Sequence, residues 1–244
     1  MSRKKRHFIL IAIVLAGVLS VGCIFTIHSL RGRREAINAA EEYLREKYLT
    51  QMTILSAKYK YRNAHGLINK YYYVSASPVD APEIVFQVVI DAVSGAPVRK
   101  SGGYQIPDNY IQICFRLDLE RELGAVIKKI WGDQGSLKVY LFDRFQNTEG
   151  LDENLPLSTL SQSIEYELRI DTNCDLNREN TEQEASKIFR LIDELKQLEL
   201  AERRIVLSYD YKNNSINYRF DAWSLLTKEE IELQLEEYQR KGAG

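Results

Sequence analysis

Histidine and cysteine, with 3 residues each, are the scarcest catalytic residue types in this chain. Of 3 histidines in 244 residues, His7 and His28 flank a long apolar run, so only His65 lies in the rest of the sequence. A Ser-His-Asp or Cys-His arrangement would need His65, which lies in a polar segment typical of a surface turn. The same count excludes a metal site built from several histidines.

Cysteine and proline are also rare, and the common nucleotide and hydrolase motifs are missing. None of the 3 cysteines forms a C-x-x-C pair, which argues against a zinc ribbon or a thioredoxin-like centre. Outside the apolar run, Cys114 and Cys174 can form a disulfide in an exported protein or remain as two separate small apolar residues. No G-x-S-x-G, P-loop or G-x-G-x-x-G motif occurs. The 5 prolines argue against long disordered linkers.

The longest uncharged stretch runs from Phe8 to Ile27, FILIAIVLAGVLSVGCIFTI. At about 1.5 Å per residue, a helix of this length crosses the ~30 Å hydrocarbon core of a bilayer. Residues 3–6, RKKR, precede it, and the positive-inside rule keeps such a tail in the cytoplasm. We therefore expect a single-pass anchor in the cell membrane. The N-terminus would be cytoplasmic, the body extracytoplasmic, and the lipid bilayer contacted through residues 8–27.

Two other interpretations of this stretch stay open. A cleaved signal peptide has an apolar region of about 7–15 residues, which is shorter than this one. In a lipoprotein the acylated residue would be Cys23, because residues 19–23, LSVGC, resemble a lipobox. The segment departs from that pattern at Ser20, where leucine is usual, and residues 24–27 remain apolar where lipoproteins become polar. A retained anchor fits the sequence best.

The rest of the chain is mildly acidic. Residues 1–32 contain five basic and no acidic residues, which leaves 28 Lys and Arg against 34 Asp and Glu in the remainder. This balance gives no electrostatic support for nucleic acid as a partner. It is typical of a charge that keeps a folded domain in solution.

Residues 33–100 are expected to form a small α+β module. Residues 33–49 have the apolar spacing of a helix, and extended runs follow at 53–61, 70–76 and 84–91. The last run and its turn, VFQVVIDAVSGAPV, resemble the closing strand-turn-strand of PepSY-type extracytoplasmic modules. The match is carried by Val88, Val89, Ile90, Asp91, Ala92, Ser94, Gly95 and Val98. The resemblance implies a module that restrains proteases or regulates envelope proteins, and it implies no catalytic residue.

Residues 101–244 are expected to form a second α+β domain, after the tail and anchor of residues 1–32. Strands are expected at 111–117, 137–142, 164–170, 203–210 and 215–220, and helices at 119–131, 181–200 and 227–241. Apolar residues four apart permit helix in place of the first strand. Thr181 to Glu184 and Thr227 to Glu230 match capping boxes. The order βαββαβ resembles a ferredoxin-like domain.

One polar segment has the spacing of calcium ligands. Residues 171–182, DTNCDLNRENTE, place Asp171, Asn173, Asp175 and Glu182 at positions 1, 3, 5 and 12 of a calcium-binding loop. However, Leu176 stands where the loop needs glycine. The alternative is a polar loop that leads into the following helix.

These observations favour a membrane-anchored protein of the bacterial envelope. Its external part would be a non-enzymatic interaction or regulatory module, with another envelope protein as a partner. Two alternatives stay open, an envelope hydrolase that uses a pair of carboxylates and a lipoprotein with a ligand-binding role. The sequence assigns no catalytic residue and, apart from calcium, no cofactor.

Overall fold

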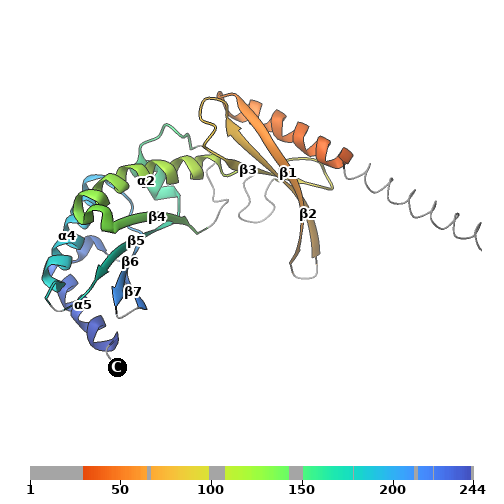
Figure 1. The fold of residues 1–244 in the computed structure, drawn as a ribbon. Helices are drawn as coiled ribbons and strands as arrows, with labels where there is room; N and C mark the ends of the chain where they lie inside the picture. Colours follow the sequence, from red (N-terminus) through yellow and green to blue (C-terminus); the bar gives the residue numbers. More distant parts are fainter. Residues whose placement is uncertain are drawn as a thin grey trace, which may run out of the picture. The chain divides into compact units, whose positions relative to one another are not determined.

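The chain is an α+β protein with two separate sheets (Figure 1). The computed structural model describes residues 30–64, 67–98, 108–142, 151–177, 179–211, 214–221 and 223–242. Two compact units are formed, Met1–Arg99 and Lys100–Gly244. The expected anchor at 8–27 and the lipid attachment at Cys23 lie outside the described residues. Within the described ranges, no helix has both the length and the apolarity of a membrane span.

The first unit packs a helix of residues 30–47 on a three-stranded antiparallel sheet. The strands are β1 (Met52–Ala64), β2 (Leu67–Pro78) and β3 (Phe86–Asp91), in the spatial order β1-β2-β3. Alternate residues of a strand point to opposite faces, so one face of the sheet is apolar and lies under the helix. The core comprises Ala36, Ala40, Leu44, Val74, Ala76, Phe86, Val88 and Ile90. The expected helix and the three expected extended runs are all present.

The turn after β3 is formed by residues of the PepSY-like match. Asp91 Oδ1 accepts hydrogen bonds from the backbone N–H groups of Val93 and Ser94, both at 2.8 Å. Gly95 has a φ of +68°, which glycine adopts without the steric penalty of a Cβ. The chain then returns, so that Pro97 bridges Ile90. This confirms a local strand-turn-strand, whereas membership of the family stays a prediction.

The second unit is a four-stranded sheet with α2, α4 and α5 on one side (Figure 1). The helices are α2 (Tyr110–Trp131), α3 (Leu157–Ser163), α4 (Thr181–Gln197) and α5 (Lys228–Gly242). The strands are β4 (Gly135–Leu141), β5 (Tyr166–Asp175), β6 (Arg204–Tyr211) and β7 (Asn214–Phe220). Two 3-10 turns, η1 (Gly132–Gln134) and η2 (Trp223–Leu225), follow α2 and β7.

The strands of this sheet lie in chain order, β4-β5-β6-β7. Strands β5 and β6 are parallel, because α4 carries the chain back to the same end of the sheet. The other two neighbouring pairs are antiparallel. The core between sheet and helices includes Leu119, Leu123, Ile127, Leu168, Ile170, Ile188, Leu191, Leu195 and Leu207.

The expected strand at 111–117 is wrong, since these residues belong to α2. Gln112 and Cys114 supplied the polar half of the alternating pattern, yet both are buried, with 0% and 7% exposure. A helical segment that is buried on all sides does not show the 3.6-residue apolar period of an amphipathic helix. The alternation of apolar and polar residues at 111–117 therefore does not indicate a strand. The domain therefore has the order α-β-α-β-α-β-β-α and not the expected ferredoxin-like βαββαβ. The helix α3 was not among the expected elements.

Candidate functional site

The face of the β4–β7 sheet opposite its helices carries a connected group of charged and aromatic side chains. Residues at alternate positions of each strand point away from the core. Two more residues, Phe142 and Asp221, directly follow β4 and β7. We call the whole set the open face: Ser136, Lys138, Tyr140, Phe142, Glu167, Arg169, Asp171, Asn173, Arg204, Val206, Ser208, Asn217, Arg219 and Asp221.

Glu167 lies at the base of the open face, with 4% of its side chain exposed. Its Oε1 accepts a hydrogen bond from Arg169 Nε at 2.6 Å, and its Oε2 accepts one from Arg204 Nη1 at 3.1 Å. The hydrogen bond to Glu167 is the main cause that raises the pKa of Arg169 above its usual value. One buried carboxylate thus positions two guanidinium groups on neighbouring strands.

Aromatic rings hold the same two guanidinium groups from the side. The guanidinium carbon of Arg169 lies 4.3 Å from the centre of the Tyr140 ring, and that of Arg204 lies 5.4 Å from the Phe142 ring. Both rings are substantially exposed, at 42% and 54%. A guanidinium that is stacked on a ring and bonded to a carboxylate has little freedom to turn. The site is therefore ordered before any ligand arrives.

A second carboxylate links this pair to the next strand. Asp221 Oδ1 accepts hydrogen bonds from Arg204 Nε at 3.1 Å and from Arg219 Nε at 2.9 Å. The bond from Arg219, followed by that from Arg204, lowers the pKa of Asp221 below its usual value. The bond to Asp221 is likewise the first cause of the raised pKa of Arg204. Both shifts in pKa favour the charged forms of Arg204 and Asp221.

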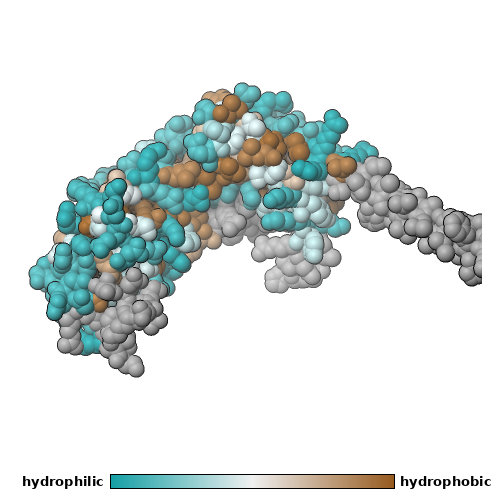
Figure 2. All heavy atoms as spheres, viewed as in Figure 1, coloured by the Kyte–Doolittle hydropathy of each residue, from teal (hydrophilic) through white to brown (hydrophobic). Residues whose placement is uncertain are grey.

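The described side chains of the open face carry both signs of charge. They include four cations, Lys138, Arg169, Arg204 and Arg219, and three acids, Glu167, Asp171 and Asp221. Residues 100–244 as a whole contain 19 Lys and Arg against 27 Asp and Glu. Elsewhere on the unit, α4 and α5 present a largely hydrophilic surface (Figure 2).

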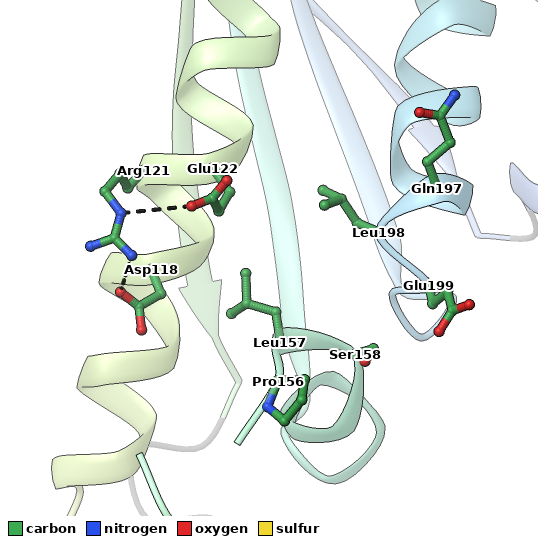
Figure 3. Close-up of a pocket in the computed structure, with 9 residues that line it drawn as sticks. All are labelled: Asp118, Arg121, Glu122, Pro156, Leu157, Ser158, Gln197, Leu198 and Glu199. Carbon is green, nitrogen blue, oxygen red and sulfur yellow. Dashed lines mark ion pairs between the residues drawn. The ribbon is translucent and has the colours of Figure 1, made fainter. Parts of the chain in front are cut away.

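The unit also has a surface hollow of about 400 Å³ between α2, α3 and the end of α4 (Figure 3). Leu157 and Leu198 point into it, while Asp118 and Glu122 lie on one side, on the same helix. Both acids bind Arg121, with N–O distances of 2.7 and 3.8 Å. A glycosidase needs two carboxyl groups on opposite sides of a scissile bond. Glu199 also lines the hollow, from the end of α4, so acids lie on two sides of it. The hydrolase alternative stays a prediction.

The expected calcium ligands lie on two elements, β5 and α4. Asp171, Asn173 and Asp175 lie in β5, where every second residue is about 7 Å further along an extended strand. Glu182 lies in the first turn of α4, with Oε1 3.1 Å from Nζ of Lys228. Among the described residues, no three His, Cys, Asp or Glu side chains form a group able to hold a metal ion. The calcium loop stays a prediction.

The two cysteines of the second unit form no disulfide. Cys114 is buried in α2, and burial is the main cause that raises the pKa of its thiol to about 12. Cys174 is partly exposed on β5 and donates a hydrogen bond to Gln134 Oε1 at 3.2 Å. Of the two alternatives left open by the sequence, the separate thiols are present.

The chain matches no protein-family model and no curated protein. Among solved structures, it is similar to the crystal structure of a DUF5037 family protein from Ruminococcus gnavus ATCC 29149. The TM-score is 0.43 at 10% sequence identity, over 84% of this chain and 98% of that chain. At these values the similarity carries no argument about function. The open face must therefore be interpreted from its own chemistry.

Proposed function

We propose that this protein is a membrane-anchored, extracytoplasmic binding module of the bacterial envelope with no catalytic activity of its own. The uncharged stretch at 8–27 and the PepSY-like match at 33–100 support the location and a regulatory role. The open face supports binding. Its two central arginines are held by Glu167 and by aromatic rings, in the manner of a recognition surface.

The chemistry of these groups favours binding over catalysis. Arginine stays protonated in proteins, so Arg169 and Arg204 bind negative charge but do not transfer protons. Their carboxylate partners, Glu167 and Asp221, are already occupied by guanidinium groups. A surface with this geometry discriminates among ligands by charge and shape, because its donors are fixed before binding.

Sided labelling of cysteines tests the location. In a variant with Cys23 and Cys174 changed to serine, Leu225→Cys places a thiol on a residue that is 81% exposed. We expect a membrane-impermeant maleimide to label this thiol in intact cells or spheroplasts. A matched variant with Ser2→Cys should stay unlabelled until the cells are lysed. Labelling of Ser2→Cys alone before lysis would overturn the proposed orientation.

The Cys23→Ser change also separates the anchor from the lipoprotein alternative. A retained transmembrane helix does not depend on this thiol, so the variant should remain in the membrane pellet after ultracentrifugation. A lipoprotein loses its only acylation site in this variant and would lose its lipid-dependent retention. Release of the Cys23→Ser variant in processed form would therefore favour the lipoprotein.

A further inference from the structure

We propose that the open face binds a polymer in which negatively charged phosphodiester groups alternate with hydroxyl-bearing units. Phosphate would contact Arg169 and Arg204, and hydroxyl groups would contact the row formed by Ser136, Asp171, Ser208 and Asn217. This inference deepens the proposed function and rests on it, because it names the ligand of the same surface.

The Arg169 guanidinium is suited to phosphate. Arg169 uses Nε for Glu167, and among the described residues its two terminal nitrogens make no hydrogen bond to the protein. Terminal N–H groups of a fixed guanidinium form the fork that binds phosphate through two parallel hydrogen bonds. Glu167 and the Tyr140 ring hold this fork in place, so little side-chain entropy is lost on binding.

The arrangement of cations indicates more than one anionic group. In the sheet register, Lys138 lies opposite Arg169, Arg169 opposite Val206, and Val206 opposite Arg219. With strands about 4.8 Å apart, this row extends over about 14 Å. Like charges directly opposite each other destabilise a strand pair, as Lys138 and Arg169 do here. A chain with repeated phosphates relieves that repulsion along the whole row.

The adjacent row supplies partners for hydroxyl groups. Ser136 lies opposite Asp171, Asp171 opposite Ser208, and Ser208 opposite Asn217. Ser208 Oγ donates to Asn217 Oδ1 at 2.6 Å, which fixes the amide. A carboxylate between two hydroxyl-bearing residues accepts hydrogen bonds from alcohols but repels a chain that is charged at every position.

Binding of three soluble polymers to the purified full-length protein in a nonionic detergent tests this proposal. Poly(glycerol phosphate) has both phosphate and hydroxyl groups, inorganic polyphosphate has only phosphate, and dextran has only hydroxyl. We expect poly(glycerol phosphate) to bind at least tenfold more tightly than either of the others at physiological salt. Equally tight binding of polyphosphate would mean that the face attracts negative charge without recognising hydroxyl groups. Equally tight binding of dextran would mean that it does not recognise phosphate. Either result would overturn the proposal.

Variants that keep the charge test the geometry. The double variant R169K/R204K retains both positive charges near Glu167 but replaces each fork with a point charge. We expect it to bind poly(glycerol phosphate) at least tenfold more weakly than the wild type. The matched control, K128Q/K129Q, removes two charges from α2 and should bind normally. Wild-type affinity in R169K/R204K would overturn the proposal.

Two single substitutions test the proposal independently of whether the double variant folds. Lys138 is exposed, so Lys138→Gln should weaken binding about twofold to threefold without affecting stability. Asp171→Asn should weaken binding of poly(glycerol phosphate) and strengthen that of polyphosphate, because it removes a repelling charge. If both variants kept the wild-type affinities for poly(glycerol phosphate) and polyphosphate, the assignment of phosphate and hydroxyl groups to the two rows would be contradicted. These binding measurements do not depend on membrane orientation. A negative result would therefore contradict the proposed ligand without contradicting the proposed location, which the labelling experiment tests separately.

Discussion

The indole N–H of Trp131, at the end of α2, donates a 2.9 Å hydrogen bond to Oε2 of Glu184, 53 residues further along the chain. The same oxygen accepts a hydrogen bond from the Tyr209 hydroxyl at 3.1 Å, and Lys187 Nζ lies 2.7 Å from Oε1. Glu184 is 2% exposed. A single buried carboxylate therefore joins α2, α4 and β6.

Replacing Glu184 should be strongly destabilising. Glu184→Ala leaves the Trp131 N–H, the Tyr209 hydroxyl and the Lys187 charge without their common acceptor. Removing one partner of a buried charge network costs about 3–5 kcal/mol. We expect a loss of this size in the free energy of unfolding, measured by urea titration of the full-length protein. Glu182→Ala serves as the control, since Glu182 is an exposed partner of Lys228 and such pairs contribute under about 1 kcal/mol. Equal losses in the two variants would contradict the assigned role of Glu184.

The two predicted capping boxes show how far local sequence determines local structure. At Thr227, both reciprocal bonds are present: Glu230 N–H donates to Thr227 Oγ1 at 3.2 Å, and Thr227 N–H donates to Glu230 Oε2 at 2.8 Å. The prediction at Thr181 is wrong, because the N-cap of α4 is Asn180 and Glu184 faces the core. The donors that attract Glu184 come from distant segments, which a four-residue pattern does not include.

The confirmed box yields a second prediction. Thr227→Ala removes the acceptor for the Glu230 N–H and should lower the free energy of unfolding by about 1 kcal/mol. Thermal or urea unfolding of the full-length protein measures this loss. Thr159→Ala, at an exposed position within α3, is the matched control and should change the value by less than about 0.5 kcal/mol. A loss in the control as large as that in Thr227→Ala would mean that the cap is not responsible.

The open face was only partly predictable. The alternation of Ile164, Tyr166, Leu168 and Ile170 already placed Glu167 and Arg169 on the face opposite the core. The sequence did not indicate that Arg204 lies beside Glu167, since that pairing depends on β5 and β6 being parallel neighbours across α4. Strand pairing is set by the packing of the whole unit, so periodicity along one segment does not reveal it.

A strained position at the end of α4 gives a third prediction. Glu199 has a φ of +52°. Its N–H donates to the carbonyl of Lys196 at 3.0 Å, and the N–H of Leu200 donates to the carbonyl of Leu195 at 3.4 Å. This is the Schellman arrangement, in which glycine usually occupies the left-handed position.

Glu199→Gly relieves the steric penalty of a Cβ in this conformation and should raise the free energy of unfolding by about 0.5–1 kcal/mol. Gln197→Gly, two residues earlier and within the helix, should lower it by a similar amount. Urea titration of both variants against the wild type distinguishes a specific backbone effect from a general effect of glycine. Destabilisation by Glu199→Gly would contradict the strain argument.

The last prediction concerns alkaline pH. Burial raises the pKa of the Cys114 thiol to about 12, against an ordinary value of 9.0. Between these values the unfolded chain releases the proton while the native protein retains it, so Cys114 lowers the free energy of unfolding as the pH rises above about 9. The slope from this group is at most about 1.4 kcal/mol per pH unit. Cys114→Ala should therefore show a shallower decline than the wild type between pH 9 and 11, whereas Cys174→Ser should keep the wild-type slope. Parallel curves for Cys114→Ala and wild type would show that the thiol titrates equally in both states.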